Sequence, residues 1–387
     1  MRRLAILGVT GSIGRQALEV VARERDRIGV VAITAGSDLD GLADAARRLR
    51  PALVGLESAA DPDAARQALA AACPEARAIV GAGAAARVAA EAEADTVLNA
   101  IVGRAGLEAS LATLERGARL ALANKETLVI GGPLIVDLLR RRGGELIPVD
   151  SEHSAALQCL GGRPAAEVER LILTASGGAL RDRADWREAT PVEVLAHPVW
   201  RMGRRITVDS ALLVNKAFEL IEARWLFGIG LDRIEAVLHP EARVHAIARF
   251  TDGSVVLQAA PPDMRLPIQL ALSWPERWGA AVAPLPIESL GELRFAPLPA
   301  GRFPGFDVAL AAGRAGGTAP CALNAADEVA VAAFLEGRIA LGQVPEILER
   351  VLAAHDVRPV ESVVQLAEVD LRARQAAAEA ARAGARA

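Results

Sequence analysis

A glycine-rich loop near the start of the chain restricts the possible folds more than any other feature. The loop, GVTGSIG at residues 8–14, follows the apolar segment RLAILG and precedes SIGRQALEVVARE, whose apolar residues have helical spacing. A second apolar segment, GVVAITAG, starts about twenty residues after the first ends. This order predicts a dinucleotide-binding unit, in which glycines permit a tight turn and the N–H groups of the helix face a phosphate. A βα turn that binds nothing is the alternative interpretation.

The same alternation of apolar and helical segments continues. PALVGL, ARAIVG, DTVLNAIVG and ARLALAN have the continuous apolar character of buried parallel strands, and alanine-rich helical segments separate them. The segment LANKETLVIGG then places Asn124, Lys125 and Glu126 at the carboxyl end of a strand. Ligands bind at this end in a doubly wound sheet. A solvated loop is the other reading of Lys125, but its Asn and Glu neighbours favour a substrate or cofactor contact.

Length and composition indicate several domains and restrict the partners. A chain of 387 residues is long for one core. We expect an α/β protein with an N-terminal Rossmann-like doubly wound sheet (1–149), a central α/β catalytic domain with a mobile lid loop (150–295), a linker (296–312) and a small C-terminal helical domain (313–387). A net charge of −4 argues against nucleic-acid binding through a basic surface. Three distant cysteines, no membrane-spanning segment and no signal peptide predict a cytoplasmic protein.

The segment IPVDSEHSA at residues 147–155 contains an acidic pair. Asp150 and Glu152 are two positions apart, so in an extended chain both side chains would point the same way. Two neighbouring carboxylates raise each other's pKa unless a cation lies between them. The pair therefore suggests a bound cation and leaves open which other residue meets it.

The middle of the chain supplies candidates for that residue. In VDSALLVNKAFELIEARWLF, Ser210 is a suitable N-cap, and Val214, Ala217, Phe218, Ile221 and Trp225 form an apolar stripe. Asn215, Lys216 and Glu219 share another face of that helix. A solvated face with an ion pair is the usual meaning of such spacing. Alternatively, Glu219 joins the acidic pair as an oxygen ligand of Mg²⁺ or Mn²⁺, and spacing does not exclude Glu222.

Two glycine-containing turns flank this helix in the sequence. Ser176-Gly177-Gly178 follows the apolar segment LILTA and is suited to binding an anion through backbone N–H groups. HPVWRMGRR contains Pro198 and Gly203 and suggests a loop that closes over a site. Trp200 in this loop is equally consistent with a lid contact and with ordinary packing.

Long segments of the chain resemble the 1-deoxy-D-xylulose 5-phosphate reductoisomerase family. They include GVTGSIG, LANKETL, PVDSEHSA, ASGGALRD, HPVWRMGRRITVDSALLVNKAFELIEARWLF and LNAADEVAVAAFL. The similarity keeps the same order and runs through essentially the whole chain. It implies a homodimeric enzyme that uses NADPH and Mg²⁺, Mn²⁺ or Co²⁺. It further implies the conversion of 1-deoxy-D-xylulose 5-phosphate to 2-C-methyl-D-erythritol 4-phosphate, in the non-mevalonate route of isoprene biosynthesis.

The resemblance also implies the residues of the site. The metal ligands would be Asp150, Glu152 and Glu219, which favours Glu219 over Glu222. The substrate would contact Lys125, Ser151, Glu152, Ser176, His197, Ser210, Asn215, Lys216 and Glu219, with the phosphate among Ser176, Ser210, Asn215 and Lys216. NADPH would contact Thr10, Gly11, Ser12, Ile13, Gly36, Ser37, Asn124, Glu126 and Gly203. The catalytic residues would be Lys125, Glu152 and His197. His245 would line the site beneath a lid of residues 194–204 that includes Trp200 and Met202.

One departure from the family pattern concerns the cofactor. The family often has basic or amide residues after the position of Gly36, whereas this chain has Ser37 and Asp38. A carboxylate at the adenosine ribose usually disfavours a 2′-phosphate. We therefore expect NADPH to be preferred, but less strongly than in a chain with a basic residue there.

Three other functions are weighed against this one. A redox-sensing nucleotide-binding protein would need the glycine loop but not the converging carboxylates. A metal aldolase would act without reduction. A semialdehyde dehydrogenase would need a nucleophilic cysteine, and Cys159 has no activating neighbours in the sequence.

Overall fold

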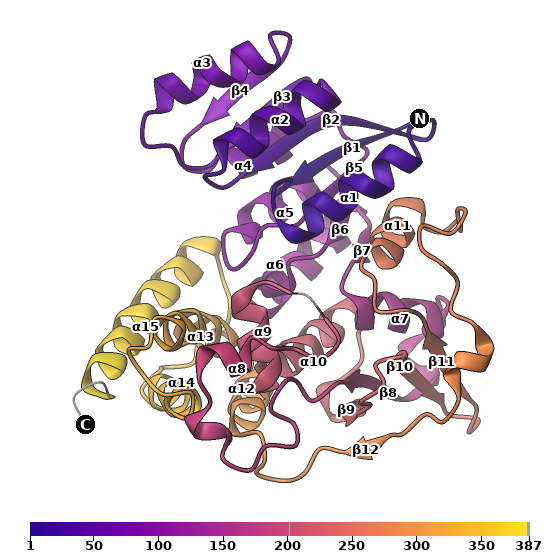
Figure 1. The fold of residues 1–387 in the computed structure, drawn as a ribbon, viewed down its shortest axis with the longest axis vertical. Coiled ribbons are helices and arrows are strands. Elements are labelled where there is room, and N and C mark those ends of the chain that lie inside the picture. Colours follow the sequence, from indigo (N-terminus) through magenta and orange to yellow (C-terminus); the bar gives the residue numbers. More distant parts are fainter. Residues whose placement is uncertain (201, 385–387) are drawn as a thin grey trace. The chain divides into compact units, whose positions relative to one another are not determined.

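The computed structural model describes residues 1–200 and 202–384, and the chain divides into two compact units (Figure 1). Unit 1 comprises Met1–Thr127, Ile135–Ser154 and Asp263–Ala283. Unit 2 comprises Leu128–Leu134, Ala155–Pro262 and Pro284–Ala387. Each unit is described by itself.

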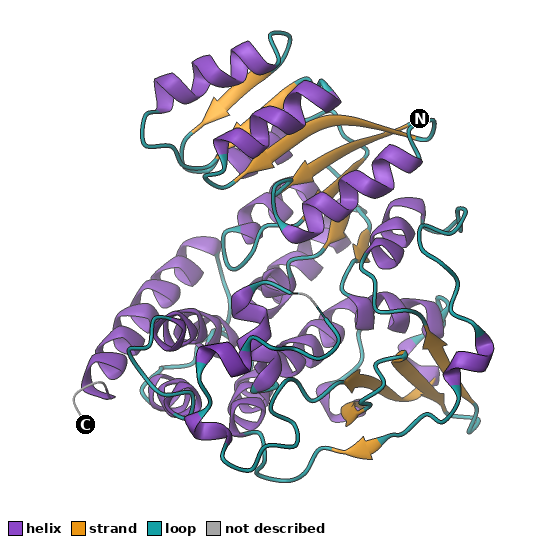
Figure 2. Cartoon of the chain, in the orientation of Figure 1, coloured by secondary structure: helices purple, strands orange, loops and turns teal. Residues whose placement is uncertain are grey.

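Unit 1 is built on a seven-stranded parallel sheet with the order β4-β3-β2-β1-β5-β6-β7 (Figure 2). Its strands are β1 (Arg2–Leu7), β2 (Ile28–Ala35), β3 (Leu53–Leu56), β4 (Arg77–Val80), β5 (Thr96–Asn99), β6 (Arg119–Leu122) and β7 (Leu146–Pro148). The strand order reverses between β1 and β5, and ligands of doubly wound sheets bind at the carboxyl ends of the strands at such a point. The expected N-terminal Rossmann-like sheet is confirmed.

Helices connect these strands. They are α1 (Ser12–Arg23), α2 (Leu39–Leu49), α3 (Pro62–Ala72), α4 (Ala84–Glu91), α5 (Gly106–Glu115) and α6 (Lys125–Arg142), with α11 (Arg265–Ser273) packed on α1 from far along the chain. All four residues of the segment Leu4–Leu7 are buried, so both faces of β1 are covered. Leu7 is paired in register with Thr34 of β2 and Asn99 of β5. The loops after these three strands therefore begin at the same level.

Unit 2 contains a mixed five-stranded sheet with the order β11-β10-β8-β9-β12. Its strands are β8 (Val168–Ala175), β9 (Ile234–Leu238), β10 (Val244–Phe250), β11 (Val255–Ala259) and β12 (Ala296–Pro297). The pair β8–β9 is parallel, whereas β10 pairs antiparallel with both β8 and β11. This sheet confirms the expected central α/β region.

The remaining helices belong mainly to unit 2. They are α7 (Ser151–Leu160), which spans the division between the units, α8 (Pro191–Val194), α9 (Arg204–Ala211), α10 (Val214–Phe227), α12 (Pro304–Ala315), α13 (Ala319–Leu335), α14 (Gln343–Ala353) and α15 (Val363–Gly384), with short 3₁₀ turns at 165–167, 186–188, 231–233 and 287–290. The C-terminal part is helical, as expected. Helix α12 begins at Pro304, within the range expected for the linker, and proline is well tolerated in the first turn of a helix.

Two local expectations are wrong. The helix expected from Ser210 is two helices, because Leu213 has a left-handed φ of +55° and forms the N-cap of α10, while Ser210 lies inside α9. Asp150 and Glu152 are not on an extended strand, because α7 begins at Ser151. The amide of Glu152 donates to Asp150 Oδ1 at 3.3 Å, as in the first turn of a capped helix.

Within the described ranges, residues 1–200 and 202–384, no helix combines the length and apolar character needed to cross a membrane.

Candidate active site

The glycine loop of unit 1 forms a tight turn at the end of β1. The N–H groups of Gly8 and Val9 both donate to the carbonyl oxygen of Thr34, at 3.0 and 2.8 Å. A Cβ on Gly14 would lie 2.3 Å from the carbonyl oxygen of Gly8, so only glycine lets α1 approach the loop this closely. Helix α1 begins after Gly11 with no side-chain cap. Its first turn, which contains Ser12 and Ile13, therefore offers backbone N–H groups to a phosphate.

The departure from the family pattern lies directly after β2. Gly36, Ser37 and Asp38 are all exposed. The Asp38 carboxylate accepts a hydrogen bond from the N–H of Gly41 at 3.0 Å and caps α2. Because this bond directs the carboxylate to the helix N-terminus, part of its charge is balanced there. Ser37 keeps an exposed hydroxyl beside it.

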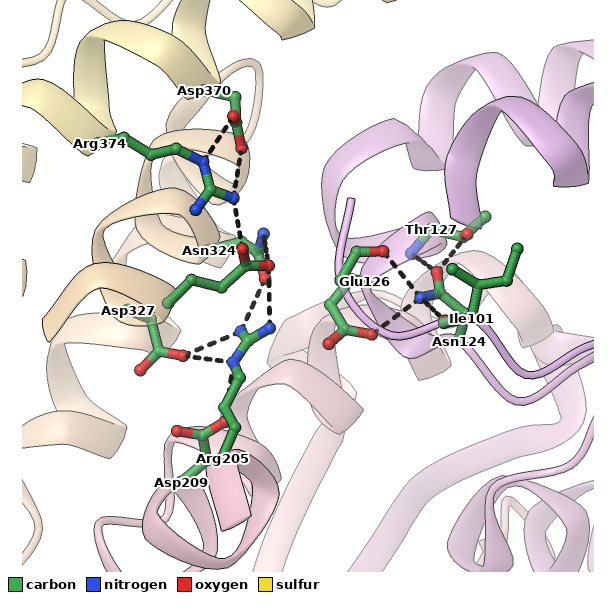
Figure 3. Close-up of polar contacts among 12 residues, drawn as sticks. Ile101, Asn124, Glu126, Thr127, Arg205, Asp209, Asn324, Asp327, Asp370 and Arg374 are labelled. Atoms are coloured by element: carbon green, nitrogen blue, oxygen red, sulfur yellow. Dashed lines mark hydrogen bonds and ion pairs between the residues drawn. The ribbon is translucent and has the colours of Figure 1, made fainter. Parts of the chain in front are cut away.

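Asn124 organises the beginning of α6 (Figure 3). Its Oδ1 accepts from the N–H of Thr127 at 2.8 Å, and its Nδ2 donates to the carbonyl oxygens of Ile101 and Gly103. The same Nδ2 contacts Glu126 Oε2 at 3.2 Å. Asn124 is buried, so its main role is to join α6 to the loop after β5. The sequence prediction that Asn124 contacts the cofactor stays a prediction, and it did not foresee this link.

Lys125 and Asp150 form a buried ion pair in unit 1. Lys125 Nζ lies 2.8 Å from Asp150 Oδ2, and His153 Nδ1 lies 3.3 Å from Asp150 Oδ1. Burial alone would raise the pKa of Asp150, but Lys125 and His153 hold that pKa well below its usual range. Asp150 is therefore a carboxylate at neutral pH. Beside it, the hydroxyl of Ser151 donates to Glu152 Oε2.

The turn after β8 in unit 2 is a backbone nest. Gly177 and Gly178 both have positive φ, and the N–H of Gly178 donates to Ser176 Oγ at 3.2 Å. A Cβ on Gly178 would lie 2.7 Å from the carbonyl oxygen of Ser210 and 2.7 Å from Cα of Ala211. The nest therefore packs tightly against the carboxyl end of α9. This contact joins the turn that carries Ser176 to the helix end that carries Ser210.

His197 is fixed in one tautomer beside the nest. Its Nδ1 accepts from the N–H groups of Val199 and Trp200 at 3.2 and 2.9 Å, so this nitrogen carries no proton. Nε2 then carries the proton and donates to Ser176 Oγ at 3.1 Å. Burial lowers the pKa of His197, which agrees with a neutral ring. Ser176 Oγ thus accepts two hydrogen bonds and can donate its own proton to an anion.

The predicted polar face of α10 is buried. Lys216 is 4% exposed and Glu219 2% exposed, which excludes the solvated interpretation. Lys216 Nζ forms an ion pair with Glu219 Oε2, and Asn215 Nδ2 donates to Glu219 Oε1 at 2.5 Å. Glu222 is also buried. Burial alone therefore does not distinguish the two acidic residues.

Part of the expected lid has a defined contact. The ring of Trp200 lies 5.9 Å from the ring of His245, at an angle of 56°. His245 Nε2 lies 3.3 Å from the carbonyl oxygen of Ala260. Gly203 is the N-cap of α9. The expected lid, residues 194–204, includes residue 201, which lies outside the described residues.

Sequence reasoning missed two features of the site. The loop 100–103 lies against the glycine loop, since a Cβ on Gly8 would be 2.8 Å from the carbonyl oxygen of Ala100. Its position directly after β5, at the carboxyl edge of the sheet, could have indicated it. The second feature is Arg205, whose partners on α13 lie more than a hundred residues away along the chain. No local pattern could have revealed these contacts.

Three family models match the chain over most of its length. The model described as 1-deoxy-D-xylulose 5-phosphate reductoisomerase matches residues 4–132. The models of its C-terminal domains match residues 146–227 and 259–376. The chain belongs to the 1-deoxy-D-xylulose 5-phosphate reductoisomerase family. Its similarity to a reductoisomerase of Gloeobacter violaceus is 48% identity over 92% of this chain and 91% of the relative. The chain is 46% identical to the reductoisomerase of Moorella thermoacetica, over 97% of both chains.

Solved reductoisomerase structures have the same fold as this chain. The enzyme of Zymomonas mobilis in complex with NADPH is 37% identical and superposes with a TM-score of 0.91, over 98% of this chain and 99% of that one. A reductoisomerase in complex with NADPH, fosmidomycin and magnesium is 34% identical, with a TM-score of 0.92, over 99% of this chain and 98% of that one. These similarities extend over both units of the chain.

Proposed function

We propose that this protein is an NADP-dependent oxidoreductase that converts 1-deoxy-D-xylulose 5-phosphate to 2-C-methyl-D-erythritol 4-phosphate with NADPH and a divalent metal ion. The product belongs to the non-mevalonate route of isoprene biosynthesis. Membership of the reductoisomerase family over essentially the whole chain carries this proposal. The chemistry of the side chains agrees with it in each part of the site.

The acidic residues suit a hard divalent ion. Asp150, Glu152 and Glu219 would supply only carboxylate oxygens to such an ion. The ion, Mg²⁺, Mn²⁺ or Co²⁺, would act as a Lewis acid on oxygen atoms of the substrate. Lys125 keeps Asp150 ionised and thus ready to serve as a ligand. Lys216 pairs with one carboxylate oxygen of Glu219 and Asn215 donates to the other, so both oxygens are oriented.

The substrate phosphate would bind in the nest of unit 2. The hydroxyl of Ser176, with both acceptor positions used by His197 and Gly178, is oriented to donate to a phosphate oxygen. Ser210, Asn215 and Lys216 would complete the site, and Lys216 contributes the positive charge. This remote binding would help to close the lid over the reacting atoms.

The reacting end of the substrate would meet the acidic groups and two further side chains. Ser151 donates a hydrogen bond to Glu152, and Glu152 would move a proton on the substrate hydroxyls. Lys125 would donate a hydrogen bond or a proton to a substrate oxygen. His197, neutral and fixed by the backbone of the lid, would exclude water from the site.

NADPH would bind at the carboxyl edge of the parallel sheet and supply hydride. Its pyrophosphate would lie on the N-terminus of α1, at Thr10, Gly11, Ser12 and Ile13. Its adenosine 2′-phosphate would meet Gly36 and Ser37, and its nicotinamide end Asn124, Glu126 and Gly203. Asp38 would weaken the preference for NADPH without reversing it, because its carboxylate is engaged with α2.

A semialdehyde dehydrogenase is disfavoured by the cysteines. All three cysteines, Cys73, Cys159 and Cys321, are buried. Burial raises the pKa of Cys159 to about 11, so its thiolate is scarce at neutral pH. A catalytic cysteine would need the opposite environment.

The decisive experiment follows NADPH absorbance with 1-deoxy-D-xylulose 5-phosphate, with Mg²⁺ or Mn²⁺ and after chelation. We expect NADPH oxidation that stops on chelation and resumes when metal is restored. Substrate cleavage without NADPH oxidation would indicate a metal aldolase. NADPH binding without turnover in the presence of metal and substrate would indicate a sensor. Either result would overturn the proposal.

We also propose a cytoplasmic homodimer. Strand β11 lies at one edge of its sheet, and its Val255, Val256 and Leu257 are exposed. An apolar edge strand is a site for pairing with a second chain, and a two-fold axis would bury it on both copies. Sedimentation of wild type and Val256→Lys tests this surface. An unchanged mass for the variant would contradict an interface at β11.

A further inference from the structure

Helix α9 connects the lid to the phosphate side of the proposed site. It spans Arg204–Ala211, begins at Gly203 and carries Ser210 near its carboxyl end. A Cβ on Gly178 would lie 2.7 Å from the carbonyl oxygen of Ser210, so the end of α9 packs closely against the nest. The position of α9 therefore sets the distance between Ser210 and the other groups expected at the phosphate.

A single guanidinium ties α9 to α13 (Figure 3). Arg205 Nη2 donates to Asn324 Oδ1 and to Asp327 Oδ2, both at 2.9 Å. Arg205 Nη1 donates to Glu328 Oε1 at 2.9 Å. Asp327 and Glu328 lie three and four positions after Asn324, so the three acceptors share one face of α13. On its own helix, Arg205 Nε lies 3.5 Å from Asp209 Oδ2.

The acceptors are themselves held in place. Asn324 and Asp327 are fully buried. Glu328 Oε2 pairs with Arg374 of α15, and Arg374 Nε donates to Asp370 Oδ2 at 2.8 Å. Burial would raise the pKa of Glu328, but Arg205 and Arg374 lower it overall, so the pair of arginines keeps this carboxylate ionised. Charge-assisted bonds with fixed geometry thus run from α9 through α13 to α15.

This arrangement requires the planar fork of arginine. Lysine carries its three donors on a single nitrogen, so it does not reproduce the planar spread of donors with which the guanidinium meets separated acceptors. The motif LNAADEV, which supplies Asn324, Asp327 and Glu328, has no role in the proposed chemistry. Its contacts with Arg205 give this motif a structural role.

We infer that Arg205 is a positioning residue for phosphate binding: it holds Ser210 and the Ser176–Gly178 nest in place by anchoring α9 to α13 and α15. The helical C-terminal part of the chain thereby controls substrate affinity although it contributes no ligand. This inference rests on the proposed function, because it assigns the nest to the substrate phosphate. NADPH would bind mainly through residues of unit 1, with Gly203 as its one proposed contact at α9, so its affinity should depend on Arg205 less than phosphate affinity does.

The test compares Arg205→Gln with Arg350→Gln. Arg350 is exposed on α14 in the same unit, so its loss removes the same charge without removing the network. Calorimetry with inorganic phosphate and with 1-deoxy-D-xylulose 5-phosphate measures binding, and initial rates give KM for substrate and NADPH. For Arg205→Gln we expect phosphate and substrate affinity to fall about tenfold or more, as displaced binding groups lose their geometry. The KM for NADPH should rise less than the KM for substrate, and Arg350→Gln should resemble wild type.

A double-mutant cycle with Ser210→Ala separates positioning from general destabilisation. If Arg205 acts through Ser210, the double variant should bind phosphate within about twofold of the weaker single variant. Additive losses, an equal loss with Arg350→Gln, or an equal loss of NADPH affinity would overturn the inference. If Arg205→Gln does not fold, Arg205→Lys and Arg374→Gln replace it, with losses of about threefold expected from partial disruption. Wild-type phosphate affinity in both would then refute it.

Failure of this inference is distinguishable from failure of the proposed function. An inactive wild type, with substrate, NADPH and metal present, would refute the function itself. An active wild type with an unaffected Arg205→Gln variant would refute only the positioning role.

Discussion

Replacing Gly178 with alanine should damage both stability and substrate binding. Gly178 has a φ of +69°, where an L-residue costs roughly 1–2 kcal/mol. The new Cβ would also lie 2.7 Å from the carbonyl oxygen of Ser210 and from Cα of Ala211, both backbone atoms that cannot rotate away. Relieving such a clash by moving the backbone typically costs about 1–3 kcal/mol. The free energy of unfolding should therefore fall by about 2–5 kcal/mol.

Gly228→Ala is the matched control. Gly228 follows α10 with a φ of +65°, and no atom lies within 4 Å of its added Cβ. This variant should lose only the conformational part, about 1–2 kcal/mol. Urea unfolding followed by circular dichroism gives both losses, and initial rates give the substrate KM. The KM should rise in Gly178→Ala alone, because only there is the nest displaced from α9.

Equal destabilisation of the two variants, with an unchanged substrate KM, would refute the reasoning. It would mean that the turn and α9 adjust freely to each other. The nest would then not depend on the helix that carries Ser210.

Four further predictions follow from the site. Glu219→Gln should weaken Mn²⁺ binding about a hundredfold, as expected when one carboxylate of a three-carboxylate site is neutralised, whereas Glu222→Gln should not. Titration calorimetry measures both affinities, and the reverse result would identify Glu222 as the ligand. Lys216→Ala should raise the substrate KM by the equivalent of about 1.5–3 kcal/mol and leave NADPH nearly unchanged, and an equal loss for both ligands would contradict a phosphate contact. Asp38→Asn keeps the cap on α2 and removes one screened charge, so it should raise kcat/KM for NADPH on the order of threefold and leave kcat/KM for NADH unchanged. A wild type that prefers NADH would refute the cofactor assignment. The hydrogen bonds to His197 Nδ1 need a neutral ring, so the contribution of His197 to substrate binding should be complete above its ordinary pKa of 6.5 and be lost as the pH falls through the lowered pKa. The substrate KM of the wild type should therefore rise at low pH. An identical rise in His197→Gln would assign this pH dependence to another group.

The sheet of unit 1 was predictable because its strands are buried on both faces. Such strands are continuous apolar runs, and the glycine loop indicates a strand before it and a helix after it. Asn124 and Lys125 were selected for the same reason, since they follow a strand at the carboxyl edge. In these places local sequence and tertiary structure impose the same requirement.

Other parts of the site depend on contacts that no local pattern contains. The left-handed φ of Leu213 is unusual for a branched side chain, so the break between α9 and α10 could not be anticipated. The helix at Ser151 begins only two residues after the end of strand β7, which made an extended reading of Asp150 and Glu152 reasonable but wrong. Arg205 meets its acceptors across 119 to 123 positions of sequence, and only the fold places them together.

The late position of α11 in the chain has a consequence for biosynthesis. All seven strands of unit 1 lie before residue 149, but α11, which packs on α1, is encoded at Arg265–Ser273. Arg2 donates to the carbonyl oxygen of Leu272 at 2.5 Å across 270 positions, and Arg119 donates to that of Trp274 at 2.7 Å. During synthesis, part of α1 in the nascent sheet therefore stays uncovered until about half of unit 2 has been translated. A gene fragment that stops at residue 149 would encode the strands without this last piece, and its product should recruit chaperones or aggregate unless a peptide of residues 263–283 is supplied.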